Sequence, residues 1–199
     1  MKFLGLVLCL ILAVLSCSAQ TIRICSGGAG QITDSLGQVW LTDQYFTGGD
    51  IGYTSDPIQG TADSRLYATT RVGLYGDFEY NIPVANGSYA LTLRFAETVY
   101  WAKGGRVFNV IVNGVPIMTN FDIMEWAPSR TAVDKTFPIT VTTGKVRIQF
   151  IGVTHRAIVS AIQLESSAFR VCPENVVLYA GESVQFTVVE GPCPAPVTK

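Results

Sequence analysis

Apolar and polar residues alternate along much of the chain. Residues 88–97, 106–113 and 145–152 each follow a period of two. In the first segment the apolar positions are Tyr89, Leu91, Leu93 and Phe95. Such alternation predicts strands that bury one face, and we find no convincing helical periodicity after residue 20.

Turn signals separate these segments. They are Asn86-Gly87, Gly104-Gly105, Asn113-Gly114 and Thr143-Gly144. Asn-Gly pairs suit tight hairpins because both residues tolerate a positive φ. Many short antiparallel strands joined by turns predict an all-β sandwich or barrel.

Residues 27–63 do not look like strands. They are rich in Gly, Thr, Asp and Gln, and they carry Trp40, Tyr45, Phe46 and Tyr53. A long irregular segment with aromatic residues in a compact domain is more often a functional loop than filler.

The pattern changes again near Ser166. Residues 167–199 hold two or three further short apolar runs, which is typical of the start of an immunoglobulin-like β segment. Because a full set of about seven strands does not fit, we interpret them as a partial immunoglobulin-like segment or a C-terminal extension.

Residues 1–19 have the layout of a secretory signal peptide. Lys2 precedes an uncharged apolar run over residues 3–15, and small residues lead to a cleavage site after Ala19. A lipoprotein acylated at Cys17 is the alternative. No later segment is apolar and long enough for a transmembrane helix, which needs about 20 residues. We therefore expect a secreted or extracellular protein, with the endoplasmic reticulum lumen or the cell surface also open.

The charge balance argues against some classes of partner. The chain of 199 residues has a formal net charge of -1 and only 15% charged residues. A near-neutral chain lacks the basic surface that binds nucleic acid or anionic lipid. We expect no nucleic-acid partner.

Motifs of catalysis are absent from the sequence. There is no Gly-x-Ser-x-Gly, no His-Glu-x-x-His and no phosphate-binding glycine loop. Glycosidases need two facing carboxyl groups, and nothing links Glu97, Asp122 and Glu125 at such a spacing. We expect no enzyme, no catalytic residue, no metal site and no cofactor.

Three cysteines remain after cleavage of the predicted signal peptide. Cys172 and Cys193 could form a disulfide bond in a secreted protein, which would contribute about 3 kcal/mol. Cys25 would then be a buried free thiol, although a bridge from Cys25 stays open. Asn86 begins the sequon Asn-Gly-Ser and is either glycosylated or part of a plain hairpin turn.

Eight motifs follow one another in a fixed order. They are residues 22–28 (IRICSGG), 33–49 (with Trp40, Asp43 and Tyr45-Phe46), 66–71 (LYATTR), 86–97, Tyr100-Trp101, 106–110 (RVFNV), 120–123 (NFDI) and 158–162 (IVSAI). This order resembles the malectin and malectin-like carbohydrate-binding domain family, and the third motif is similar to the family signature Leu-Tyr-Gln-Thr-Glu-Arg. The resemblance covers about residues 21–165.

The resemblance implies a jelly-roll-like antiparallel β-sandwich over residues 20–166. The founding member of the family is a lectin of the endoplasmic reticulum that binds glucose disaccharides through aromatic residues on loops at one end. By position, its stacking residues fall on Tyr67, Tyr100 and Trp101. A further family tyrosine falls where this chain offers Tyr45 or Tyr53.

Two departures from the family pattern concern specificity. The family's binding aspartate aligns with Thr154 or His155, and Thr70 replaces the glutamate of the signature. A carboxylate accepts hydrogen bonds from two hydroxyl groups, whereas a neutral histidine has one acceptor nitrogen. Asp122 could orient a ligand or form an Asx turn.

Each aromatic candidate also has a structural alternative. Tyr67 lies in a strand-like run, where burial competes with binding, and Trp40, Phe46 and Trp126 are more typical of core or loop-packing residues. Arg71 suits an ion pair. Two functions follow as hypotheses: a secreted lectin-like module that recognises an oligosaccharide through loop aromatics, or an extracellular protein-interaction or adhesion module on the same scaffold.

Overall fold

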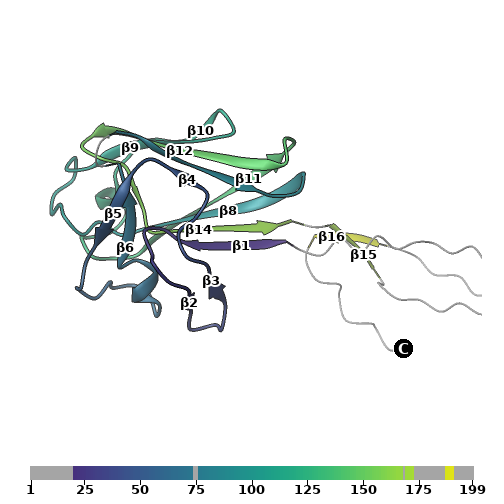
Figure 1. Ribbon diagram of the computed structural model, residues 1–199, viewed down its shortest axis with the longest axis horizontal. Helices are drawn as coiled ribbons and strands as arrows, with labels where there is room; N and C mark the ends of the chain where they lie inside the picture. The colour runs from purple at the N-terminus through teal and green to yellow at the C-terminus, as the bar shows by residue number, and fades with distance from the viewer. Residues whose placement is uncertain (1–19, 74–75, 168, 173–186, 191–199) are drawn as a thin grey trace, which may run out of the picture.

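Two antiparallel sheets face each other in the computed structural model, which describes residues 20–73, 76–167, 169–172 and 187–190 (Figure 1). The four-stranded sheet has the order β1 (Thr21–Cys25), β14 (Ala161–Ser166), β8 (Gly87–Phe95) and β11 (Val133–Val141). The five-stranded sheet has the order β10 (Val115–Phe121), β9 (Val107–Val112), β12 (Lys145–Thr154), β7 (Phe78–Pro83) and β4 (Phe46–Thr47). The predicted all-β antiparallel sandwich is confirmed.

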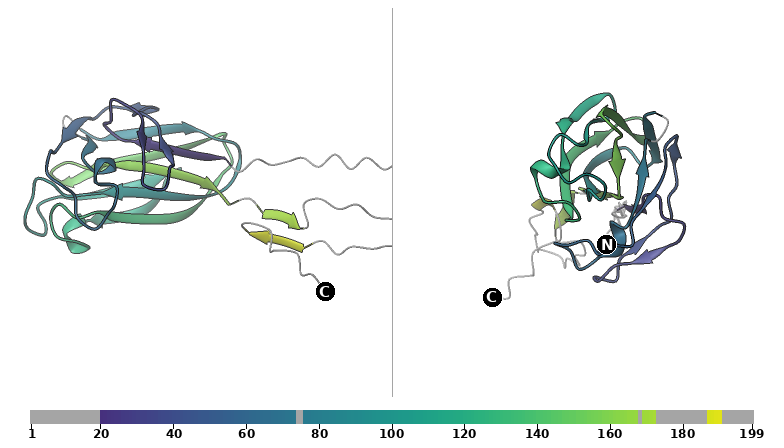
Figure 2. Two further views of the ribbon diagram at one scale, coloured as in Figure 1. Left: turned by 90° about the horizontal axis from the view of Figure 1, so that it is seen from below. Right: turned by 90° about the vertical axis from the view of Figure 1, so that its left-hand side faces the viewer.

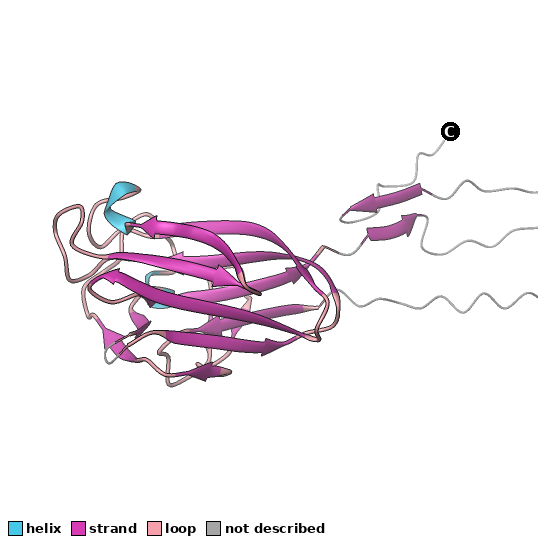
Figure 3. Ribbon diagram, turned by 90° about the horizontal axis from the view of Figure 1, so that it is seen from above, coloured by secondary structure: helices cyan, strands magenta, loops and turns pink. Residues whose placement is uncertain are grey.

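Smaller elements complete the fold. One sheet has the order β13 (Ile158–Val159), β6 (Thr69–Val72) and β5 (Asp50–Tyr53), and another pairs β2 (Ile32–Thr33) with β3 (Val39–Trp40). Two short 3-10 helices, η1 (Ser64–Leu66) and η2 (Ile123–Glu125), are the helical elements of the described residues (Figure 3).

The ends of the chain lie largely outside the described residues. The predicted signal peptide does so entirely. Within residues 167–199, β15 (Phe169–Cys172) pairs with β16 (Thr187–Glu190). Cys193 is also outside the described residues, so the disulfide with Cys172 and the immunoglobulin-like segment stay predictions.

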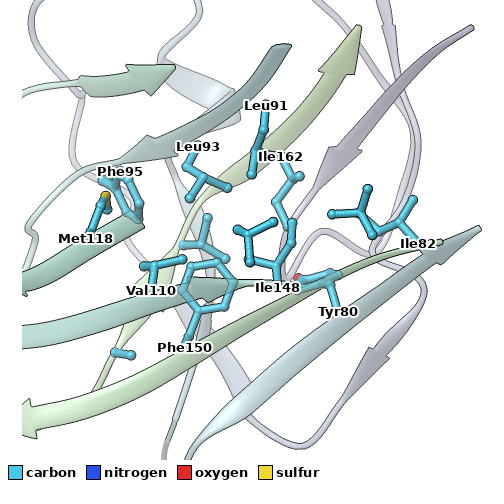
Figure 4. Packing of buried hydrophobic residues seen from close by; sticks show 14 of the residues in the cluster. Tyr80, Ile82, Leu91, Leu93, Phe95, Val110, Met118, Ile148, Phe150 and Ile162 are labelled. Carbon is cyan, nitrogen blue, oxygen red and sulfur yellow. The ribbon is translucent and has the colours of Figure 1, made fainter. Parts of the chain in front are cut away.

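The core lies between the two main sheets and follows the predicted alternation (Figure 4). In β8 the odd-numbered residues Tyr89 to Phe95 are buried, and in β12 the same holds for Val146, Ile148 and Phe150. The Phe150 ring stacks on Phe78 at 4.6 Å between centroids. Burial of each such side chain contributes about 1.5–3 kcal/mol, so the two apolar faces hold the sheets together.

A second buried cluster attaches the irregular segment to the sandwich. It contains Cys25, Trp40, Ile58, Leu66, Tyr67, Ala96 and Ala161. Trp40 is fully buried, as one of the alternatives for it predicted. Cys25 is a buried free thiol, which agrees with the prediction, and burial raises its pKa.

A buried ion pair secures the same segment. The Oδ2 atom of Asp43 lies 2.5 Å from Nη2 of Arg71 and also accepts a hydrogen bond from the backbone N–H of Gly27 at 2.6 Å. The Tyr80 hydroxyl donates to the other oxygen of Asp43 at 2.8 Å. The prediction of an ion pair for Arg71 is thus confirmed, and its guanidinium lies over the half-exposed ring of Phe46.

The two ends of the sandwich differ. At one end the strands are joined by tight turns, among them residues 84–86, 113–114 and 142–144. Asn86 is exposed in one of these turns, and its side-chain oxygen accepts the N–H of Gly144 at 2.7 Å. At the other end lie the long loops 96–106 and 122–132 and the short loop 155–157 (Figures 1 and 2). We call this the loop end.

Candidate functional site

The loop 96–106 is shaped by a buried ion pair at its base. Glu97 and Arg106 occupy opposite ends of the loop, and their side chains are 1% and 6% exposed. The Glu97 Oε2 atom lies 2.6 Å from Nε of Arg106, while Oε1 accepts the backbone N–H groups of Val99 and Tyr100 at 2.9 and 3.1 Å. One carboxylate therefore closes the loop and sets the backbone at Tyr100, directly before Trp101.

Trp101 lies at the surface of the loop end. Its side chain is 66% exposed. The guanidinium carbon of Arg130 lies 4.8 Å from the centre of the indole ring, and Arg130 forms an ion pair with Asp56 at 2.6 Å. The contact orients the ring and leaves most of its surface open to a ligand, while the ion pair sets hydrogen-bonding groups beside it.

Tyr100 is half-buried between other loops. Its ring centre is 5.0 Å from that of His155 and 5.1 Å from the guanidinium carbon of Arg106. His155 itself is exposed and has a positive φ of 56°. The structure therefore brings together three of the predicted residues, Tyr100, Trp101 and His155, at the loop end.

Tyr67 is placed differently from these three. It is 2% exposed, and burial raises its pKa well above the usual value for tyrosine. Its hydroxyl donates to the Asp134 carboxylate at 2.6 Å and accepts a hydrogen bond from Arg94 at 3.1 Å. Both partners belong to the sandwich, so the ring links the second buried cluster to it. In this conformation its ring presents no face for stacking.

Tyr45 and Tyr53 lie on the irregular segment. Tyr45 is 41% exposed with a φ of 65°, and its carbonyl accepts the N–H of Asn81 on β7. Tyr53 ends β5, is 73% exposed, and precedes Asp56 by three residues. Three residues after Tyr53, the chain reaches Asp56, which pairs with Arg130.

Asp122 caps a turn. It is 6% exposed; one oxygen accepts the N–H of Met124 at 2.9 Å, and the other accepts that of Gly104 at 2.5 Å. Of the two roles left open by the sequence, the turn-forming one is present. Both oxygens are engaged in holding the loop 96–106 against η2.

The sequence pattern did not indicate a functional role for Arg130 or Asp56. They are separated by 74 positions in the chain, and nothing in their local patterns marks them. The loop end they complete has apolar ring surface, guanidinium and imidazole donors, and a carboxylate acceptor. Sugars present apolar C–H faces between hydroxyl groups. The ring surface at the loop end can contact the C–H faces, and its donors and acceptor can bind the hydroxyl groups.

Within the residues that the structure describes, no group of three or more His, Cys, Asp or Glu side chains is arranged to hold a metal ion. In the same residues, no helix has the length and apolar character needed to cross a membrane.

Sequence comparison places the chain among known proteins. The profile of the family described as "Malectin domain" matches residues 21–167. Malectin-A of Xenopus laevis is 31% identical over 118 residues, which cover 50% of this chain and 42% of that protein. Human malectin is 33% identical over 90 residues, 44% of this chain and 30% of that protein. The chain thus matches less than half the length of these two relatives.

Similar structures are parts of larger proteins. The extracellular domain of ANXUR1 from Arabidopsis thaliana superimposes with a TM-score of 0.66 at 19% identity, over 74% of this chain and 49% of that one. A β-glucuronidase from Bacteroides uniformis gives a TM-score of 0.65 at 21% identity, over 74% of this chain and 18% of that one. At such identities these likenesses establish a shared fold.

Proposed function

Since the chain belongs to the malectin domain family, we propose that it is a secreted carbohydrate-binding module and that it recognises an oligosaccharide at the loop end. The observation that carries the proposal is the exposed ring of Trp101, held beside Tyr100 at the tip of a loop whose base is clamped by a buried ion pair. A rigid platform loses little conformational entropy when a ligand binds.

Each group at the loop end has a role in this proposal. Trp101 stacks on the apolar face of one sugar ring, and the half-buried ring of Tyr100 contacts the next. Arg130 donates hydrogen bonds to sugar hydroxyl groups, and Asp56 accepts hydrogen bonds from other hydroxyl groups. The family's aspartate aligns with Thr154 or His155, and neutral His155 supplies one acceptor nitrogen where a carboxylate supplies two oxygens. We therefore propose a ligand other than the glucose disaccharide of the family's founding member.

A glycan array with the purified full chain tests the proposal, followed by calorimetry with the best ligand. We expect the chain to bind a defined set of glycans and Trp101→Ala to weaken that binding at least tenfold, which corresponds to about 1.4 kcal/mol. Leu36→Ala is the control, because Leu36 is 79% exposed on a different hairpin. Lack of binding across a broad array by the folded chain would refute the proposal.

The alternative function is that of an extracellular protein-interaction module without sugar binding. It is favoured by Ile51 and Tyr53, which are 57% and 73% exposed at alternate positions of β5, an edge strand. Exposed apolar side chains on one face of an edge strand suit a protein contact. Binding of a purified protein partner that is lost in Tyr53→Ala, and unaffected by free sugar and by Trp101→Ala, would support this function instead.

A further inference from the structure

A cavity opens at one side of the sandwich, next to η2, and Trp101 is not among its lining residues. Its volume is about 420 Å³, within the usual range for small-molecule sites of roughly 300–1,000 Å³. β10 and β11, which line it, are edge strands of opposite sheets. The core side chain of Met118 and the half-buried ring of Phe137 form apolar parts of its lining.

Trp126 lies at this cavity instead of in the core or packed within a loop. It follows η2, and its side chain is 63% exposed. An exposed indole beside a cavity provides the flat apolar surface on which a sugar ring stacks. Thr119 and Asn120, both exposed, add a hydroxyl and an amide to the lining.

Lys135 brings a positive charge into the cavity. It belongs to the inward-facing row of β11, between Val133 and Phe137, and its Nζ atom lies 2.7 Å from the centre of the Trp126 ring. Burial lowers the pKa of Lys135, which indicates that its ammonium group has lost part of its hydration.

The carboxylates around Lys135 are engaged elsewhere. Glu125 pairs with Lys103 at 2.7 Å, and Asp134 pairs with Arg94 at 2.6 Å. Glu125 and Asp122 also line the cavity; Asp122 is 6% exposed, and its two oxygens accept backbone N–H groups. Among the described residues no ion pair of Lys135 is formed, so the cavity holds a cation to which an anionic ligand is complementary.

The flanking strands are poorly suited to bind an added peptide strand. Pro116 lies within β10 and Pro138 within β11, and the pairing of β10 with β9 shifts register twice. Prolines and bulges on edge strands discourage further strand pairing. These features favour a small ligand over a peptide.

We propose that this cavity is a second ligand site and that it takes an acidic sugar, such as a uronic acid unit. The pyranose ring stacks on Trp126, and its carboxylate accepts a hydrogen bond from the ammonium group of Lys135. Binding replaces a cation–π contact by a charge-assisted hydrogen bond, which is a strong type. The proposal does not rest on sugar binding at the loop end.

Two probes that differ in one group test it: methyl β-D-glucuronide, and methyl β-D-glucoside, which has a hydroxymethyl group in place of the carboxylate. Calorimetry with the purified full chain gives at least tenfold tighter binding of the glucuronide. Raising the salt concentration from about 0.05 to 0.5 M weakens that binding, because salt screens the charge pair. Lys135→Met and Trp126→Ala each weaken it at least tenfold.

Lys145→Met is the matched control, because Lys145 is an exposed lysine at the start of β12, at the end with the tight turns; it leaves glucuronide binding unchanged. Circular dichroism and the melting temperature show that each variant is folded, and Lys135→Gln replaces Lys135→Met if the latter is not. Equal affinity for both probes, no binding of either, or full binding by folded Lys135 and Trp126 variants overturns the proposal. The proposal is also overturned if Trp101→Ala abolishes glucuronide binding while the Lys135 and Trp126 variants still bind, because the ligand would then bind at the loop end.

Discussion

Replacement of Arg106 by methionine tests the ion pair that shapes the loop end. Arg106→Met keeps an unbranched side chain of similar length and removes the charge. The carboxylate of Glu97, 1% exposed, then stays buried with two backbone N–H groups but without a cation. Removing one partner of a buried ion pair costs about 3–5 kcal/mol. For a domain of this size that lowers the melting temperature by roughly 6–20 °C.

The measurement is thermal and urea unfolding followed by circular dichroism. Arg147→Met is the matched control, because it also removes one positive charge from an ion pair, that of Glu79, in which the side chains are 47% and 24% exposed. A pair this exposed contributes at most about 1 kcal/mol.

A double variant separates charge from packing. Combining Glu97→Gln with Arg106→Met removes both charges, while the glutamine side-chain oxygen can still accept a backbone N–H. We expect it to be more stable than Arg106→Met alone, because no uncompensated buried charge remains. If Arg106→Met were no more destabilising than Arg147→Met, or if the double variant were the least stable of the three, the reasoning would be wrong.

Three further predictions concern the scaffold. Gly27→Ala should destabilise the fold by about 1–3 kcal/mol, because φ is +71° and a Cβ atom there would lie 2.4 Å from the Thr70 carbonyl oxygen; an unchanged urea midpoint would contradict this. Phe150→Ala should lower the free energy of unfolding by about 3–5 kcal/mol and Phe150→Leu by clearly less, since the ring stacks on Phe78 in the core. Equal losses for the two variants in chemical denaturation would contradict the idea that the removed side-chain volume sets the cost. Cys25, whose pKa is raised by burial, should resist alkylation in the native protein and react after denaturation; peptide mass spectrometry would reveal a reaction in the native state.

The pattern of the sequence by itself determined the all-β class and the core-facing positions, and the family resemblance selected the sandwich over a barrel. Alternation with a period of two specifies which side chains a strand buries, and this is a local property of segments such as residues 88–97. The Asn-Gly turn at residues 113–114 is local in the same way, and Asn113 indeed adopts a φ of 49° there. The order of the motifs also identified the family, because each motif is a short local run of residues and can be recognised without the tertiary structure.

Only the tertiary structure decided which aromatic residues are accessible. The family resemblance made both Tyr67 and Trp101 candidates, with burial as the alternative for Tyr67; the structure buries Tyr67 and leaves Trp101 two-thirds exposed. Trp126 suited the core or a packed loop, and it lies exposed beside a cavity. Exposure depends on which distant segments cover a side chain, and no local pattern records that.

The same limit applies to pairs of residues. The ion pairs of Arg130 with Asp56 and of Arg71 with Asp43 join positions 74 and 28 residues apart. Lys135 lies in the inward-facing row of the edge strand β11, and the opening beside that row exists only once the two sheets have packed. Folding thus creates the loop end and the cavity beside Trp126 by bringing together segments that are far apart in the sequence.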